Sequence, residues 1–131
     1  MVTDPIGDFI IQLKNASISK KDVVVIPYSK FKFEVAEVLK KIGYLKSVNK
    51  KGKKVQKTIE IEMLYGKDNK SPIHGVQRVS KPGNRSYCAF KDINPVKYGK
   101  GSLILSSPKG VLTDGDARRE RVGGEALFKI W

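Results

Sequence analysis

The sequence predicts an α+β protein made of two small α/β halves, the second mostly β with one short helix. Two segments with apolar residues at helical spacing lie in the first 65 residues, together with β-branched runs of strand length. After residue 72, short strand patterns separated by glycine and proline turns dominate. The polar stretch 66–72 is the expected linker between halves 1–65 and 73–131.

The first half is expected to begin with a helix that Asp4 caps and Pro5 opens. Its apolar face consists of residues at i, i+3, i+4 and i+7, namely Ile6, Phe9, Ile10 and Leu13. A β-branched strand over 23–28 follows. A second helix is predicted to start at the cap Ser29 and to end at Gly43, the usual place for a C-terminal glycine.

A hairpin closes the first half, with the basic segment 50–54 at its tip. In its second strand one alternating set of side chains faces the core: Val55, Ile59, Ile61 and Met63. Glu60 and Glu62 alternate with this set, which predicts a solvent-facing role rather than an acid–base pair.

The second half is predicted to contain four short strands, around 73–80, 85–90, 102–106 and 125–131. Turns are expected at 81–84 and 94–101. A short helix near 114–121 has Thr113 as its cap, with Asp114 and Asp116 complementing the helix dipole. The paired glycines 123–124 are expected to end this helix.

The charge balance is the strongest functional signal in the sequence. Lys and Arg number 26 against 13 Asp and Glu, a formal net charge of +13. Residues 1–65 hold 13 basic and seven acidic residues, and residues 66–131 hold 13 and six, so no separate basic tail exists. This balance favours a polyanionic partner, nucleic acid before membrane, over lysines that serve solubility alone.

The remaining bulk features predict an intracellular protein without metal or cofactor. Cys88 is the only cysteine, which excludes an intrachain disulfide, and His74 is the only histidine, so the two cannot form a structural zinc site. No apolar run approaches the roughly 20 residues that a transmembrane helix needs. The N-terminus does not resemble a secretory signal.

Enzyme signatures fail when they are tested against their spacing. A Walker-type phosphate loop would require glycine at Asn94 and Ser or Thr at Gly101. The turn 106–110 has a proline that lacks an amide donor, so it is a poor nest for a nucleotide phosphate. His74 has no orienting carboxylate in the sequence, and Cys88 lies in an apparent strand as a small hydrophobe. The sequence predicts no catalysis.

Three short stretches combine hydroxyl and basic side chains in a way that suits a phosphate backbone: 28–32, 80–87 and 106–110. Each of them is also compatible with an ordinary turn or helix cap. Together with the net charge they favour nucleic acid, and RNA over DNA, because no DNA-binding helix or zinc-finger pattern is present.

Four motifs in order, at residues 3–16, 80–87, 105–118 and 122–125, closely resemble the bacterial small-subunit ribosomal protein eight family. The resemblance covers essentially the whole chain. It implies two tightly associated α/β halves and a primary binder of an irregular stem in the central domain of small-subunit ribosomal RNA. It also implies cytoplasmic or organellar ribosomes as the location, neighbouring ribosomal proteins as partners, and in some lineages repression of the protein's own operon through a messenger RNA stem.

The resemblance also implies which residues bind RNA. The main loop corresponds to Ser106, Ser107, Pro108, Lys109 and Gly110, followed by Gly124 and Glu125. Further positions are Thr3, Asp4, Pro5, Asn15, Ser29, Lys30, Lys32, Lys81, Pro82 and Tyr87. This chain departs from the family at two loop positions, where Ser107 stands for threonine and Pro108 for serine.

Two other readings stay open on the sequence alone. A nucleotide-dependent enzyme would use Lys100 and the turn 106–110 on phosphates, against the failed spacing. A general basic chaperone or structural protein would bind RNA without preference for one stem.

Overall fold

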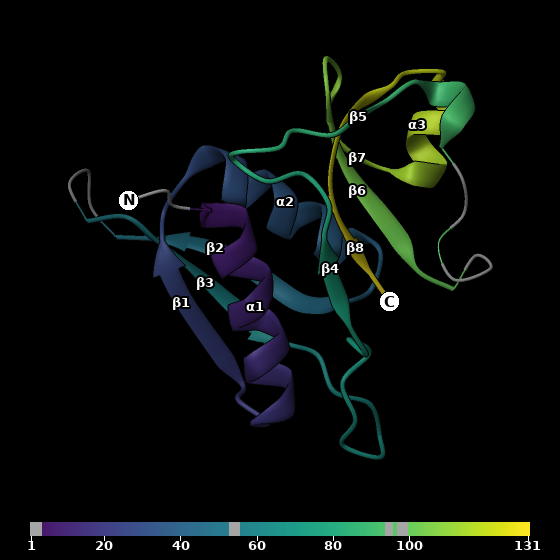
Figure 1. Ribbon diagram of the computed structural model, residues 1–131. Coiled ribbons are helices and arrows are strands. Elements are labelled where there is room, and N and C mark those ends of the chain that lie inside the picture. The colour runs from purple at the N-terminus through teal and green to yellow at the C-terminus, as the bar shows by residue number, and fades with distance from the viewer. Residues whose placement is uncertain (1–3, 53–55, 94–95, 97–99) are drawn as a thin grey trace. The chain divides into compact units, whose positions relative to one another are not determined.

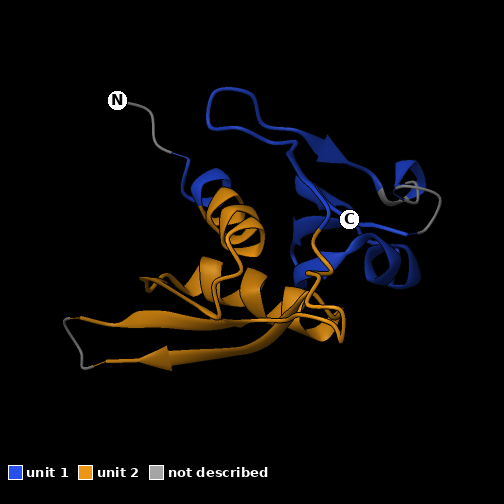
Figure 2. Ribbon diagram, turned by 90° about the horizontal axis from the view of Figure 1, so that it is seen from below, with its two compact units in different colours: residues 1–8, 74–131 blue, residues 9–73 orange. Residues whose placement is uncertain are grey.

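The computed structural model describes residues 4–52, 56–93, 96 and 100–131, so the predicted positions of Thr3, Val55 and Asn94 lie outside the described residues. Figure 1 gives the elements in chain order. The chain divides into two compact units, residues 1–8 with 74–131 and residues 9–73 (Figure 2). Helices accompany an antiparallel sheet in both units, which confirms the α+β class and the mostly β second half.

The unit of residues 9–73 combines two helices with a three-stranded antiparallel sheet of order β1-β3-β2. Its elements are α1 (Pro5–Ile18, whose first residues group with the other unit), β1 (Val23–Pro27), α2 (Lys30–Lys41), β2 (Leu45–Lys51) and β3 (Thr58–Met63). In Figure 2 both helices lie on the same side of this sheet. The predicted linker 66–72 lies within this unit.

Alternation along the strands explains why one face of this sheet is buried. Val24 is opposite Ile61, and Ile26 is opposite Ile59, so these apolar side chains share a face. The predicted apolar face of α1 is confirmed, because Ile6, Phe9, Ile10 and Leu13 are all buried. The predicted stop of α2 is also confirmed, since Gly43 follows the helix with a φ of 93° that favours glycine.

The other unit is built on an antiparallel sheet of order β4-β8-β6-β7, with β5 also paired to β8. Its elements are β4 (Val76–Arg78), β5 (Tyr87–Cys88), the 3₁₀ helix η1 (Phe90–Asp92), β6 (Ser102–Ser107), β7 (Gly110–Thr113), α3 (Asp114–Glu120) and β8 (Gly124–Ile130). From their registers, β4 and β5 lie end to end along one edge of β8.

Helix α3 packs its Ala117 into an apolar cluster with Leu103, Leu105 and Ala126 of the sheet. Its cap is as predicted, with the Asp116 amide donating to Thr113 Oγ1 at 3.2 Å. The preceding Asp114 carboxylate is buried, and it accepts from the Leu103 amide at 3.2 Å and pairs with Arg118. The helix start is therefore tied to strand β6.

Two expectations about this unit were wrong. Strand β7 was not predicted, because the proline and glycine of the turn 106–110 indicated a strand end, whereas the chain reverses there and continues the sheet. The glycines 123–124 do not end α3. Arg121 ends it, in the left-handed conformation with a φ of 56°. The predicted strands 73–80 and 85–90 are also shorter than expected.

Candidate nucleic-acid interface

Three of the predicted contact residues form a row across neighbouring strands of the unit of residues 1–8 and 74–131, which we call the C-terminal unit. Tyr87 of β5 is opposite Glu125 of β8, and Glu125 is opposite Ser106 of β6. Opposed residues of antiparallel strands project to the same face, so the three side chains stand side by side. We call Tyr87, Glu125 and Ser106 the cross-strand row. Tyr87 is 73% exposed, and Ser106 Oγ has no hydrogen-bond partner among the described residues.

The centre of the cross-strand row is fixed by a buried serine that the sequence did not single out. Ser80 is fully buried, and its hydroxyl donates to Glu125 Oε2 while accepting from the Ser86 amide at 3.2 Å. Arg85 Nη1 lies 3.0 Å from the same carboxylate oxygen. Glu125 is thereby held in one position and its charge is matched.

Gly124 brings strands β8 and β6 together beneath the row. A Cβ at this position would lie 2.2 Å from the carbonyl oxygen of Ser106. Gly123 has the same role beside β5, where a Cβ would lie 2.2 Å from the carbonyl oxygen of Cys88. The paired glycines therefore allow close backbone approach, and Gly124 contributes to the site through packing.

The turn that joins β6 to β7 is tight, with Pro108 and Lys109 between the paired residues Ser107 and Gly110. Ser107 Oγ donates to the Gly110 carbonyl at 2.8 Å and accepts from the Lys109 amide at 3.1 Å. Proline suits the second position of such a turn, because its φ is fixed near about −65°. Gly110 takes a φ of 107°. Pro108 is thus compatible with the turn, and Lys109 is exposed at its tip.

The hydrogen bonds divide the two loop serines into different roles. The Ser107 hydroxyl donates its hydrogen bond within the turn. The Ser106 hydroxyl, in contrast, can still donate and accept a hydrogen bond, because the described residues provide it with no partner. Ser106 is therefore the better candidate for direct contact, and Ser107 is the residue that shapes the turn.

The turn at 81–84 is confirmed by reciprocal backbone hydrogen bonds between Lys81 and Asn84, at 3.1 and 2.9 Å. It places exposed Lys81 and half-buried Pro82 just before Arg85, which pairs with Glu125. Nine predicted positions, together with Tyr87, are thus carried by the two turns and the strands that the cross-strand row connects.

Asp4, at the start of α1, is engaged within the protein. Its carboxylate accepts from the Gly7 amide at 3.1 Å, as a cap does, and from Arg78 Nε and Nη2, each at 3.0 Å. The Arg78 hydrogen bonds hold the pKa of the Asp4 carboxyl below its ordinary value, against the opposing effect of burial. The exposed neighbour Pro5 opens the helix as predicted.

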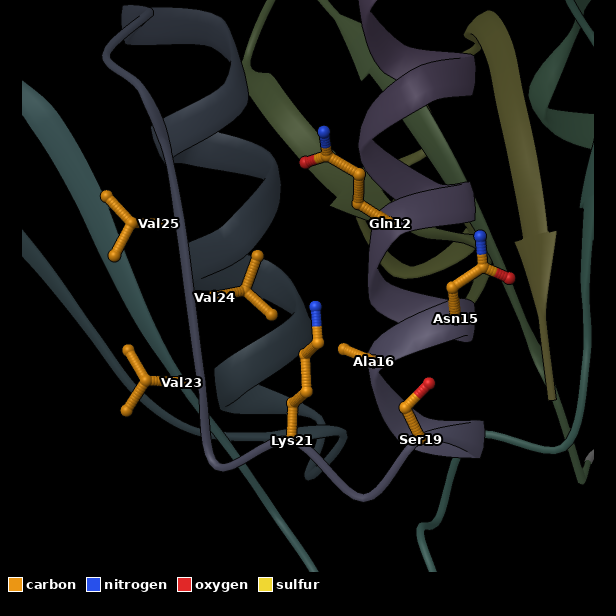
Figure 3. A pocket seen from close by; sticks show the side chains of 8 residues that line it. All are labelled: Gln12, Asn15, Ala16, Ser19, Lys21, Val23, Val24 and Val25. Carbon is orange, nitrogen blue, oxygen red and sulfur yellow. The ribbon is translucent and has the colours of Figure 1, made fainter.

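The remaining predicted positions lie on the unit of residues 9–73. Ser29 is the cap of α2, accepting from the Lys32 amide at 3.5 Å, and Lys30 is exposed in the first turn. Asn15 is exposed on α1 and lines a cleft of about 380 Å³ beside β1. Figure 3 shows Lys21 pointing along the space between α1 and β1 in this cleft.

The residues considered for catalysis are not assembled into a site in the described part of the chain. His74 is exposed, and Cys88 is half-buried against the apolar cluster of its unit. Asp, Glu, His and Cys side chains do not gather in a metal-binding group within the described ranges. Among the helices that the structure describes, all are too short or too polar to cross a membrane.

Comparison with known proteins shows that the chain is similar to ribosomal proteins, and it then shows to which family of them. The model of a ribosomal protein family, described as ribosomal protein S8, matches residues 4–131. Small ribosomal subunit protein uS8 of Persephonella marina is 45% identical over 136 aligned positions that cover all of both chains. The uS8 proteins of Mycoplasmopsis agalactiae and Rubrobacter xylanophilus are each 45% identical over 130 positions, covering 99% of this chain and 98% of theirs.

The chain belongs to the ribosomal protein S8 family, as its motifs indicated. This family is not enzymatic, which confirms that prediction and removes the nucleotide-dependent enzyme as a reading of Lys100 and the turn 106–110.

Proposed function

We propose that the chain is a constituent of the small ribosomal subunit that binds an irregular stem in the central domain of the small-subunit ribosomal RNA and helps to organise that domain during assembly. The family, the names of the relatives and the net charge of +13 support this role. The observation that carries it is the cross-strand row, where an exposed aromatic ring, a salt-bridged carboxylate and an unengaged hydroxyl adjoin a tight turn with a cation at its tip.

The groups of the row suit the irregular parts of an RNA stem. Bulged or unpaired bases expose their edges, which a small hydroxyl such as that of Ser106 can reach as donor or acceptor. The 2′-hydroxyl of the ribose offers the same chemistry. Tyr87 presents a ring on which a base can stack, and Lys109 and Lys81 supply charge for the phosphates on either side.

The candidate positions on the other unit supply a different kind of contact. Lys30 and Lys32 are ammonium groups in the first turn of α2, and Asn15 is an exposed amide on α1. Such groups bind phosphate and ribose without reading sequence. We assign them to backbone contacts that add affinity, whereas the cross-strand row supplies preference for the stem.

In this role the chain works in the ribosome, in the cytoplasm, beside neighbouring small-subunit proteins and without a cofactor. Repression of its own operon would use the same surface on a messenger RNA stem of similar shape, and it stays a prediction from the resemblance. A general basic chaperone would instead bind RNA by charge alone.

Binding of the central-domain stem, compared with an unrelated stem of the same length, tests the proposal. We expect clear preference for the central-domain stem. Ser106→Ala should lose about 1 kcal/mol, a factor of roughly five, on that stem only. Ser102→Ala is the matched control, since Ser102 is also half-buried on β6 but lies four residue pairs away from the row. Equal affinity of the unmodified protein for both stems would reject the proposal.

A further inference from the structure

A cluster of two lysines around a tyrosine lies at one end of the three-stranded sheet. Lys50 Nζ is 5.1 Å and Lys57 Nζ is 5.7 Å from the centre of the Tyr28 ring. We call these three residues the Tyr28 cluster. We propose that the Tyr28 cluster is an additional RNA site, in which the two ammonium groups bind phosphates of the RNA backbone. The proposal rests on the proposed function and adds residues that the family motifs do not include.

The strand register explains why these residues meet. Lys50 is opposite Ile59, which is opposite Ile26, and the Tyr28 amide donates to the Lys57 carbonyl at 3.0 Å. Opposed residues share a face, so Lys50, Lys57 and Tyr28 continue the face that carries Ile26 and Ile59. In Figure 1 the described ends of β2 and β3 reach the same end of the sheet at which β1 passes into α2. The lysines therefore occupy core-face positions where the apolar core ends.

The charges of this cluster differ from those of its neighbours on β2. Lys46 lies 3.8 Å from Glu62 and Lys51 lies 3.1 Å from Glu60, so both have an acidic partner. Within the described residues, Lys50 and Lys57 have no carboxylate at ion-pair distance, and both are exposed. Two cations are thus gathered on one surface without a counter-charge.

The aromatic ring compensates this concentration of charge only in part. Each ammonium group is attracted to the face of the Tyr28 ring, but the two ammonium groups repel each other. Tyr28 is half-buried, and its ring centre lies 6.1 Å from that of Phe33 on α2. The ring is a fixed platform for the lysines, which leaves phosphate, rather than a stacked base, as the RNA group that fits.

A purely structural role for these lysines makes a different prediction. An inward-facing lysine on an edge strand discourages pairing with another sheet, and β2 is an edge strand of the order β1-β3-β2. The alkyl stems also cover apolar surface. If this were their whole role, replacing them would change aggregation or thermal stability and leave the salt dependence of RNA binding unaltered.

The experiment compares two double variants of the full chain that remove the same charge. Lys50→Gln with Lys57→Gln removes the cluster, and Lys46→Gln with Lys51→Gln removes two lysines that already have acidic partners. Affinity for a central-domain transcript is measured between 50 and 200 mM salt. We expect the cluster variant to lose about tenfold less affinity over this range than the unmodified protein, since each phosphate contact adds roughly threefold. The control variant should follow the unmodified protein.

Tyr28→Phe separates the platform from the hydroxyl, because it keeps the ring and should keep the full salt dependence. Each single lysine variant should lose about threefold less affinity over the same salt range than the unmodified protein. The single variants keep the test decisive if the double variant is unstable. Equal salt dependence in the two double variants would overturn the proposal, as would a cluster variant that only aggregates. If the unmodified protein shows no preference for the central-domain stem, the proposed function fails, whereas the contrast between the two double variants remains measurable on any RNA.

Discussion

The two sheets hold their candidate contact residues in different ways. In the C-terminal unit the cross-strand row is part of the strand ladder, and it is fixed by a buried serine, a salt bridge and a glycine that permits close strand approach. In the unit of residues 9–73 the lysines stand on exposed positions beside a helix cap and an aromatic ring. In the C-terminal unit, the interactions that position the contact residues also stabilise the fold. In the unit of residues 9–73, the lysines can be replaced with little effect on the stability of the fold.

The largest effect is expected from Gly124→Ala, which tests how far the row depends on strand packing. The new Cβ would lie 2.2 Å from a backbone oxygen of β6, so a strand must move. Overpacking of this kind costs about 3 kcal/mol, and RNA binding should fall with it. Thermal unfolding measures the loss. Gly83→Ala is the control, because a Cβ there would meet nothing within 4 Å. Equal stability of the two variants would contradict the packing role.

A smaller loss is expected from Glu125→Ala. Ser80 would keep its buried hydroxyl without the acceptor, and Arg85 would lose its partner. An unsatisfied buried group costs about 1–3 kcal/mol, which denaturant titration can resolve. Arg85→Ala removes the exposed partner alone and should cost under about 1 kcal/mol. If Arg85→Ala proves the more destabilising change, the buried hydrogen bond is not what holds the row.

The sequence predicted most of the framework, because periodicity and caps are local. The apolar face of α1, the Ser29 and Thr113 caps and the turn at 81–84 were all visible as short patterns. Strand β7 was missed because a two-residue turn and a strand end have the same residue signature. The glycines 123–124 were assigned to a helix end, since close approach of separate strands has no local signature.

Long-range pairing explains what the sequence could not give at the candidate interface. The Ser80–Glu125 and Asp4–Arg78 contacts join residues 45 and 74 positions apart, so neither partner identifies the other. The Tyr28 cluster, in contrast, could have been predicted from the sequence. Continuing the alternation of Ile61 and Ile59 by one step places Lys57 on the core face, and an inward lysine is the signal to follow.

An effect confined to acid is expected at Asp4, where the C-terminal unit holds the start of α1. Its folded pKa is lowered, chiefly by hydrogen bonds from Arg78, so its stabilising contribution is complete above 3.8 and is lost as the pH falls through the lowered value. Unfolding measured from pH 5 to pH 2 should therefore show a steeper loss in the unmodified protein than in Asp4→Asn. Parallel curves would mean that the Arg78 contact does not stabilise the folded state.

The smallest effect on stability, and the sharpest contrast with Gly124, is expected from Lys30→Gln. Lys30 and Lys32 lie in the first turn of α2, which has no acidic residue, and cations there oppose the helix dipole. Replacing Lys30 should leave the free energy of unfolding unchanged or raise it by about 0.3 kcal/mol. The slope of log affinity against log salt should meanwhile fall by roughly 0.9 if the ammonium contacts a phosphate. A lysine that slightly destabilises its own helix is explained by binding, so a variant that loses stability and keeps its salt dependence would contradict this account.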